Sequence, residues 1–255
     1  MPRSYCVRAE VKRGTWIGVA AAAVFVVVFV ARIPASWVIP TGGANPLCAS
    51  VEGSLWSGSC NAMSIAHNPI GDVTWELHPL RLFAGELAAH ATAVHGAAQA
   101  SADVALSFGQ RITARNLIGD LPLDPALIPG LPATLKGRAH FDLPFARMER
   151  GVVRQLQGRI EVRDLEDLSG GATPLGSYVI EFPAGATGDP VGKLHDLEGP
   201  LAVEGTMRLT PQPGFDLQGE VTARPGAPPE LINNIRFLGS PDALGRRPFG
   251  VSGTL

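Results

Sequence analysis

The chain has 255 residues, of which 45% are hydrophobic and 17% are charged. These are the proportions of an ordinary globular protein, so disorder throughout the chain is excluded. The formal net charge is only -2 and no basic stripe interleaved with aromatic residues occurs, which argues against a nucleic-acid partner.

The first element in chain order is an uncharged apolar run, TWIGVAAAAVFVVVFVA, at residues 15–31. As a helix it would span roughly 26 Å, close to the hydrocarbon core of a bilayer. Four Lys or Arg residues precede it and Arg32 follows, so the positive-inside rule keeps the N-terminus cytoplasmic. A cleaved signal peptide is the alternative, but its apolar core is usually shorter. We expect a cytoplasmic segment at 1–13, a single transmembrane helix at 14–32 and a periplasmic β-rich domain at 33–255.

Two cysteines, Cys48 and Cys60, follow on the exported side of this helix, where an oxidising compartment allows a disulfide. The segment VEGSLWSGSC at 51–60 is typical of a hairpin. Centring that hairpin on Ser54 pairs Val51 with Ser57 and sets the two cysteines opposite each other, within reach of a disulfide. Their spacing matches neither redox nor zinc motifs. We predict a structural disulfide, with free thiols as the alternative.

Beyond residue 36, apolar and polar residues alternate, which is the period of a strand with one buried face. The clearest case is a hairpin formed by 201–210 and 215–224, with the turn PQPG between them. Shorter alternations occur at Val73, Trp75 and Leu77; Val104, Leu106 and Phe108; Ala139, Phe141 and Leu143; and Ile160 and Val162. One-sided strands indicate an antiparallel sheet. Because no fixed repeat length emerges, we interpret the domain as a meander.

Helix is scarce in the exported part. The segment PPELINNIRFLG at 228–239 places Leu231 and Ile235 at helical spacing between prolines and a glycine. This predicts one short helix near the C-terminus, packed on the sheet. The Gly- and Pro-rich section 170–199 predicts loops between two halves of one sheet system.

The apolar face of the predicted sheet can be arranged in two ways. It can close on itself as a sandwich, or it can remain open as a groove for acyl chains or partner segments, and alternation alone does not distinguish them. The alanine-rich section 87–104 supplies little core volume. We expect a closed core, because most alternating sheets bury their own faces.

A search for catalytic, cofactor-binding and metal-ligating motifs finds none. His90 and His95 are the closest pair of histidines, and their odd spacing places them on opposite faces of a strand. The segment GDPVGKL at 188–194 lacks residues that a phosphate-binding loop requires. The acidic stretch RDLEDL at 163–168 is interpreted as a solvated turn. We therefore expect no enzyme activity, no metal and no cofactor.

Three blocks of the chain resemble the type II secretion system protein N family. They are VEGSLWSGSC at 51–60, DVTWELHPLRLFAGEL at 72–87 and the closing segment 217–255. Between about 110 and 195 the similarity is loose. The resemblance implies an accessory subunit in the bacterial inner membrane, part of the machinery that moves folded proteins from the periplasm through the outer membrane. It implies no enzyme activity and no cofactor.

The resemblance also implies partners, namely other subunits in the inner-membrane platform and the secretin. Members of the family are similar in turn to the β-rich, groove-shaped AsmA and TamB type of envelope protein, so the alternative function is a lipid-binding or lipid-transfer module. No catalytic residues are carried over. The residues expected to be architectural or to form contact surfaces are Gly53, Trp56, Gly58, Trp75, Pro79 and, in the final strand, Phe249.

Overall fold

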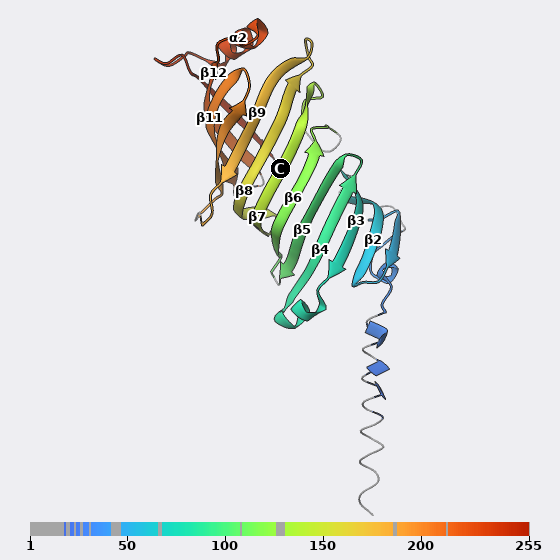
Figure 1. The fold of residues 1–255 in the computed structure, drawn as a ribbon. Coiled ribbons are helices and arrows are strands. Elements are labelled where there is room, and N and C mark those ends of the chain that lie inside the picture. Colours follow the sequence, from blue (N-terminus) through green and yellow to red (C-terminus); the bar gives the residue numbers. More distant parts are fainter. Residues whose placement is uncertain are drawn as a thin grey trace, which may run out of the picture.

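The architecture is one long sheet, given by a computed structural model (Figure 1). The structure describes residues 18, 21–22, 24–25, 28–30, 32–41, 47–65, 68–107, 109–125, 131–185, 188–212 and 214–254. Within them, 13 strands lie side by side in chain order. Every neighbouring pair is antiparallel. The antiparallel meander predicted from alternation is confirmed.

The shortest described strand lies at the N-terminal end of the sheet, and the two longest lie in its middle. The strands are β1 (Ser50–Gly53), β2 (Ser57–Ile65), β3 (Asn68–Leu77), β4 (Glu86–His95), β5 (Ala98–Ser107), β6 (Arg111–Pro122), β7 (Leu135–Glu149), β8 (Val152–Asp167), β9 (Thr173–Phe182), β10 (Val191–Glu198), β11 (Leu201–Thr210), β12 (Gly214–Ala223) and β13 (Arg247–Thr254). The helices are η1 (Ala35–Trp37), η2 (Pro79–Ala84), α2 (Pro229–Ile235) and η3 (Arg236–Leu238).

The sheet has one apolar and one polar face along its whole length. Directly paired residues of neighbouring strands share a face, so the register traces rows of side chains across all the strands. One row runs through Val51, Cys60, Val73, Ala93, Ala100, Gly119, Phe141, Ile160, Ile180, Leu194, Gly205, Gly219 and Phe249. We call the face that carries this row the apolar face.

The adjacent row of residues, on the opposite face, is almost entirely polar. It runs through Glu52, Ser59, Thr74, Thr92, Ser101, Ile118, Asp142, Arg159, Glu181, Lys193, Thr206, Gln218 and Gly250. We call this side the polar face. Along a single strand the two-residue period shifts by one residue at each bulge: on β6, Ile112 and Ala114 share the apolar face with Leu117 and Gly119. The bulges of β6, β7 and β8 thus keep each strand in phase with its neighbours.

The expectation of a closed core is wrong. All 13 strands enter a single layer, so no second sheet among the described residues covers the apolar face. Leu87 and Leu106 on this face are each 44% exposed. The alanines of β4 and β5 leave this part of the face shallow, because a methyl group projects little from the pleat.

Most of the buried apolar volume lies at the C-terminal end of the sheet. There β11 and β12 curve beside α2 (Figure 1). Leu194, Leu201, Val203, Val221 and Leu231 form one buried cluster. Leu231 comes from α2, so the predicted helix is confirmed, together with its packing on the sheet. The predicted hairpin of β11 and β12 is also confirmed, with Leu209 paired to Phe215 beside the turn.

The prediction of loops at 170–199 is wrong. β9 and β10 fill most of this section and pair with each other. Its glycines mark distortions within the sheet: Gly176, with φ +109°, lies where the pairing with β8 shifts register. Gly199, with φ +132°, lies in the turn before β11. These backbone angles favour glycine, so the composition that indicated loops reflects bulges and tight turns.

The predicted cytoplasmic segment 1–13 lies outside the described residues, as does most of the predicted transmembrane segment 14–32. Its described members at 18, 21–22, 24–25 and 28–30 are helical. Within the described part of the chain, no helix combines the length and apolarity needed to cross a membrane.

Candidate interaction surfaces

The hairpin at the start of the sheet carries the predicted disulfide. Cys48 and Cys60 are joined, with their Cα atoms 5.5 Å apart, and both are buried. The hairpin exists, but its predicted register is wrong: Val51 pairs with Cys60 instead of Ser57. The turn lies between Ser54 and Ser57, where the Ser54 N–H donates to the Ser57 carbonyl at 2.9 Å. Cys48 therefore precedes β1 instead of facing Cys60 across the ladder.

Two tryptophans donate hydrogen bonds at this turn, Trp56 from within it and Trp75 from β3. Trp56 Nε1 donates to the carbonyl oxygen of Val30 at 2.8 Å, which connects the hairpin to the helical residues at the N-terminus. Trp75 Nε1, from β3, donates to the carbonyl oxygen of Leu55 at 3.1 Å. Buried indole N–H groups need such partners. The two contacts fix the turn relative to the chain entering the sheet.

Aromatic rings lie over glycines of neighbouring strands at five places on the apolar face. A Cβ added to Gly58 would lie 2.6 Å from Trp75 Cζ2, and one added to Gly119 would lie 2.4 Å from Phe141 Cζ. The other pairs are Phe182 over Gly192, Phe249 over Gly219 and Phe215 over Gly253. A glycine within a strand commonly marks such a close approach. Each ring lies over the backbone of the neighbouring strand, so these aromatic side chains project little from the apolar face.

The sequence-predicted residues fall into two separate groups. Gly53, Trp56, Gly58 and Trp75 meet around the first turn, and Pro79 begins η2 just after β3. Phe249 lies on β13, at the other end of the sheet. Sequence reasoning did not single out Phe141, Phe182 and Phe215 as rings that contact glycines, although alternation placed Phe141 on the apolar side of its strand. The available signal was a glycine in the middle of a neighbouring alternating run.

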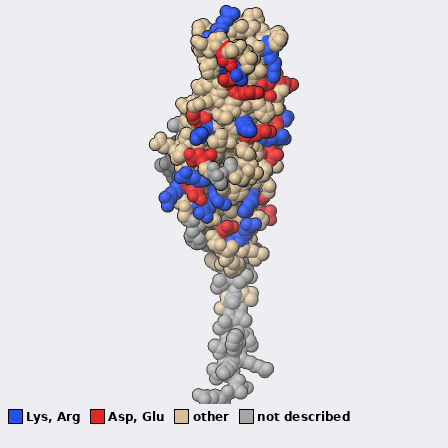
Figure 2. Space-filling view, turned by 90° about the vertical axis from the view of Figure 1, so that its left-hand side faces the viewer, with Lys and Arg blue, Asp and Glu red and all other residues tan. Residues whose placement is uncertain are grey.

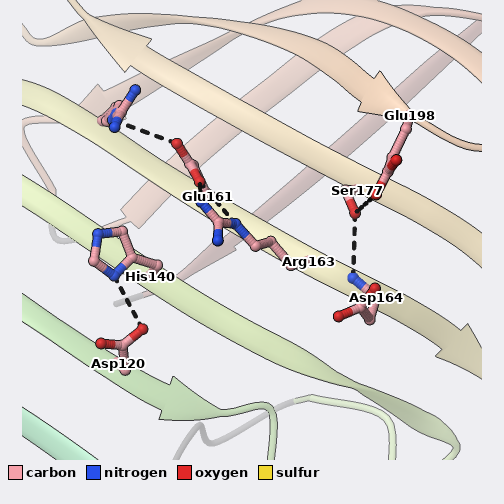
Figure 3. Close-up of polar contacts among 8 residues, drawn as sticks. Asp120, His140, Glu161, Arg163, Asp164, Ser177 and Glu198 are labelled. Carbon is pink, nitrogen blue, oxygen red and sulfur yellow. Dashed lines mark hydrogen bonds and ion pairs between the residues drawn. The ribbon is translucent and has the colours of Figure 1, made fainter.

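On the polar face, the most buried charge is the carboxylate of Glu161 (Figure 3). Arg163 donates to it from two nitrogens, and Arg159 Nε lies 3.4 Å from its Oε1. The hydrogen bond from Arg163 lowers the pKa of Glu161, because it stabilises the ionised form more than burial destabilises it. Between β7 and β6, His140 Nδ1 lies 3.0 Å from Asp120 Oδ1.

A second polar group fixes a bulge in β8. The Asp164 N–H donates to Ser177 Oγ at 3.2 Å, and Ser177 Oγ lies 3.5 Å from Glu198 Oε1 (Figure 3). Asp164 has φ +51°, so this hydrogen bond supports a backbone conformation that is uncommon for a non-glycine residue. The prediction of a solvated turn at 163–168 is wrong in its placement, because β8 continues to Asp167.

Charges on the polar face form pairs of opposite sign, such as Arg111 with Glu149 and Arg159 with Glu161. On the side of the molecule drawn in Figure 2, Lys and Arg likewise lie beside Asp and Glu along the length of the domain. Throughout the described ranges, no cluster of three or more His, Cys, Asp or Glu side chains is placed to hold a metal ion. The contacts of Glu161 and Ser177 hold strands and bulges in place.

These features define a class, the extended single-layer β-meander with two chemically different faces. Within it, the chain belongs to the type II secretion system protein N family. Residues 47–250 match the family described as type II secretion system (T2SS), protein N. The chain is 25% identical over 219 residues to the type II secretion system protein N of Vibrio cholerae serotype O1 (strain ATCC 39315 / El Tor Inaba N16961), covering 80% of this chain and 83% of that relative. No solved structure matches the chain.

Family membership makes the chain a component of type II protein secretion, and the resemblance stated from sequence is confirmed. The matched range begins one residue before Cys48 and ends within β13. It therefore takes in nearly the whole sheet, including both groups of predicted residues.

Proposed function

We propose that the chain is a non-catalytic accessory subunit of the type II secretion machinery, anchored in the bacterial inner membrane. The N-terminal residues 1–13 are cytoplasmic, residues 14–32 cross the membrane and residues 33–255 form a periplasmic domain. The observation that carries the proposal is the family match over residues 47–250, because it spans the sheet from its first strand to its last.

Two contacts near the N-terminus support this placement. The disulfide between Cys48 and Cys60 is buried under the first hairpin, and such bridges persist in oxidising compartments such as the periplasm. The hydrogen bond from Trp56 to Val30 ties the apolar N-terminal segment to that same hairpin. An anchor attached in this way would hold the sheet at the membrane surface.

The outer edge of β13 is the proposed contact surface for other subunits. Among the described strands β13 pairs with β12 alone, so its other side offers free backbone N–H and C=O groups. The opposite end of the sheet differs: Pro34 bridges to Ser54 beside β1. An extended segment of a platform subunit or of the secretin could add to β13 as a further strand.

Photo-crosslinking in cells tests this edge. We place a photoreactive phenylalanine analogue at Val251, which is 52% exposed on β13, in the full chain expressed with the complete secretion system. The matched control is Val94, which is 46% exposed on the polar face of β4. We expect a crosslink to another secretion subunit from position 251 and none from position 94. Equal crosslinking at both positions, or none at 251, would contradict the edge as the contact.

Two further measurements test the role and the topology. Deleting the gene should leave substrates of the secretion system in the periplasm, and restoring the full chain should release them into the medium. Alkaline phosphatase, which is active only after export, should be active when it is fused after Leu255. Normal secretion without the gene would refute the role, and an inactive but intact fusion would refute the topology.

A further inference from the structure

The short helix η2, between β3 and β4, has no buried side chain. Leu80 is 80% exposed and Phe83 is 92% exposed. Residues three apart in a 3-10 helix project in the same direction, so these two side chains form one apolar projection. Leu82 beside them is 44% exposed. A group of large apolar side chains directed into solvent marks an interaction surface.

The position of η2 in the fold indicates what covers this projection. Figure 1 shows η2 as the short teal coil below β4, at the end of the sheet from which the N-terminal helical residues leave. That exit is fixed by the hydrogen bond from Trp56 to the carbonyl of Val30 and by the bridge between Pro34 and Ser54. The projection and the N-terminal helical residues therefore share one end of the molecule.

The residues around this exit have the chemistry of a membrane interface. Trp37, in the segment that joins the helical residues to the sheet, is 71% exposed. Arg81, between Leu80 and Leu82, is half exposed and lies 3.5 Å from Glu86. Aromatic and aliphatic side chains favour the boundary between headgroups and acyl chains, and a flanking arginine suits the anionic headgroups above them.

We propose that Leu80 and Phe83 insert into the periplasmic leaflet of the membrane that the N-terminal helix crosses. This inference rests on the proposed function, because it needs the anchor to be in the bilayer. The sheet then has two attachments to the membrane, the anchor and η2, which together fix its orientation. Phe237 in η3 provides a contrast: it is 88% exposed, but η3 follows α2 at the opposite end of the sheet.

Depth-dependent fluorescence quenching tests the proposal. Single cysteines are placed at Phe83, Phe237 and Val24 in the full chain carrying Cys6→Ser, while Cys48 and Cys60 remain paired. Each variant is labelled with an environment-sensitive NBD dye and reconstituted into nanodiscs of phosphatidylethanolamine and phosphatidylglycerol. Lipids carrying a nitroxide near the headgroup or deep in the acyl chain then quench those dyes that lie in the bilayer.

We expect the dye at position 83 to show blue-shifted emission and to be quenched by the shallow nitroxide, while the dye at 237 is unaffected. An unquenched dye at 83 together with a quenched dye at 24 would refute the η2 contact and leave the anchor intact. An unquenched dye at 24 would refute the anchor itself, and the η2 contact with it. Blue-shifted but unquenched emission at 83 would show burial against protein and would also overturn the proposal.

Discussion

Gly58 on β2 has no room for a side chain. A Cβ there would lie 2.6 Å from both the carbonyl oxygen of Glu52 and the ring of Trp75. Gly58→Ala should therefore lower the free energy of unfolding by roughly 1–3 kcal/mol, the usual cost of overpacking. The matched control is Gly250→Ala on β13, where the nearest atom is 3.9 Å away. Urea denaturation of both variants checks this, and equal losses would contradict the role of the ring.

Glu161 should make the stability of the sheet depend on pH. Its pKa in the folded chain lies below the ordinary value of 4.5, so its charge stabilises the fold above about pH 4.5. That contribution is lost as the pH falls through the lowered pKa. Glu161→Gln should cost roughly 1.5–3 kcal/mol at pH 7, as expected for a lost hydrogen bond to a charged group, and the difference from wild type should shrink in acid.

Denaturation midpoints measured at pH 7 and at pH 3 check this dependence. Glu149→Gln is the control, because Glu149 pairs with Arg111 at 2.9 Å on the exposed surface, where such pairs contribute little. A difference between wild type and Glu161→Gln that stays constant across this range would show that the charge of Glu161 does not stabilise the fold.

At the scale of the element, α2 packs on the sheet through the buried Leu231, with the partly buried Ile235 against the same cluster. Leu231 packs into the cluster formed by β10, β11 and β12. Leu231→Ala should cost roughly 2–5 kcal/mol, the range for buried leucines. Leu238→Ala in η3, where the side chain is 41% exposed, should cost much less. Thermal denaturation compares the two, and a small loss for Leu231→Ala would show that α2 is not part of the core.

The disulfide between Cys48 and Cys60 should stabilise the first hairpin, as Leu231 stabilises the packing of α2. The bridge between Cys48 and Cys60 closes a short loop, which corresponds to roughly 3 kcal/mol in the chain-entropy account. Replacing both cysteines with serine should lower the free energy of unfolding by about this amount. Reducing the wild-type protein should reproduce the loss and have no further effect on the double variant. An unchanged denaturation curve would contradict a structural role for the bridge.

Predictability from sequence differed between elements for physical reasons. The hairpin of β11 and β12 could be predicted because its apolar side is uninterrupted from Leu201 to Leu209. The strands at 173–182 and 191–198 could not, because Gly176 and Gly199 mark a bulge and a turn with the same residue that marks a loop. The register of the first hairpin could not be predicted either. Hydrogen bonds between Ser54 and Ser57 set its turn, and the pattern of apolar and polar residues does not reveal them.

At the scale of the whole molecule, the decisive feature is that each described strand forms its ladder hydrogen bonds only with its neighbours in chain order. Stability in such a sheet should be local. Leu231→Ala should therefore speed hydrogen exchange in β10–β13 while leaving β2–β4 protected, and loss of the disulfide should do the reverse. Hydrogen exchange with mass spectrometry checks both variants. Uniform loss of protection across the sheet would show that it unfolds as a single unit.

The openness of the sheet was not predictable from the pattern of residues. Alternation assigns each side chain to a face, and it did so correctly for Val203 and Phe141, but it does not say what covers that face. The same holds for the candidate residues: Trp75 and Gly58 could be singled out, yet their contact depends on pairing between β2 and β3. The openness follows from the order of the strands in one layer and the contact follows from their pairing, and neither is written in the pattern of a single strand.

The order of the strands also determines how the molecule can be assembled. Each strand finds its partner in the segment made immediately before it, so a chain emerging from its N-terminus can extend the sheet one strand at a time without waiting for distant sequence. Until β13 has formed, the most recently made strand is a temporary edge strand, whose unpaired backbone groups can pair with a strand of another molecule. If synthesis is interrupted late, the strands already made should therefore form a shorter sheet with correct pairing. The last of these strands would be an exposed edge whose unpaired backbone groups favour aggregation.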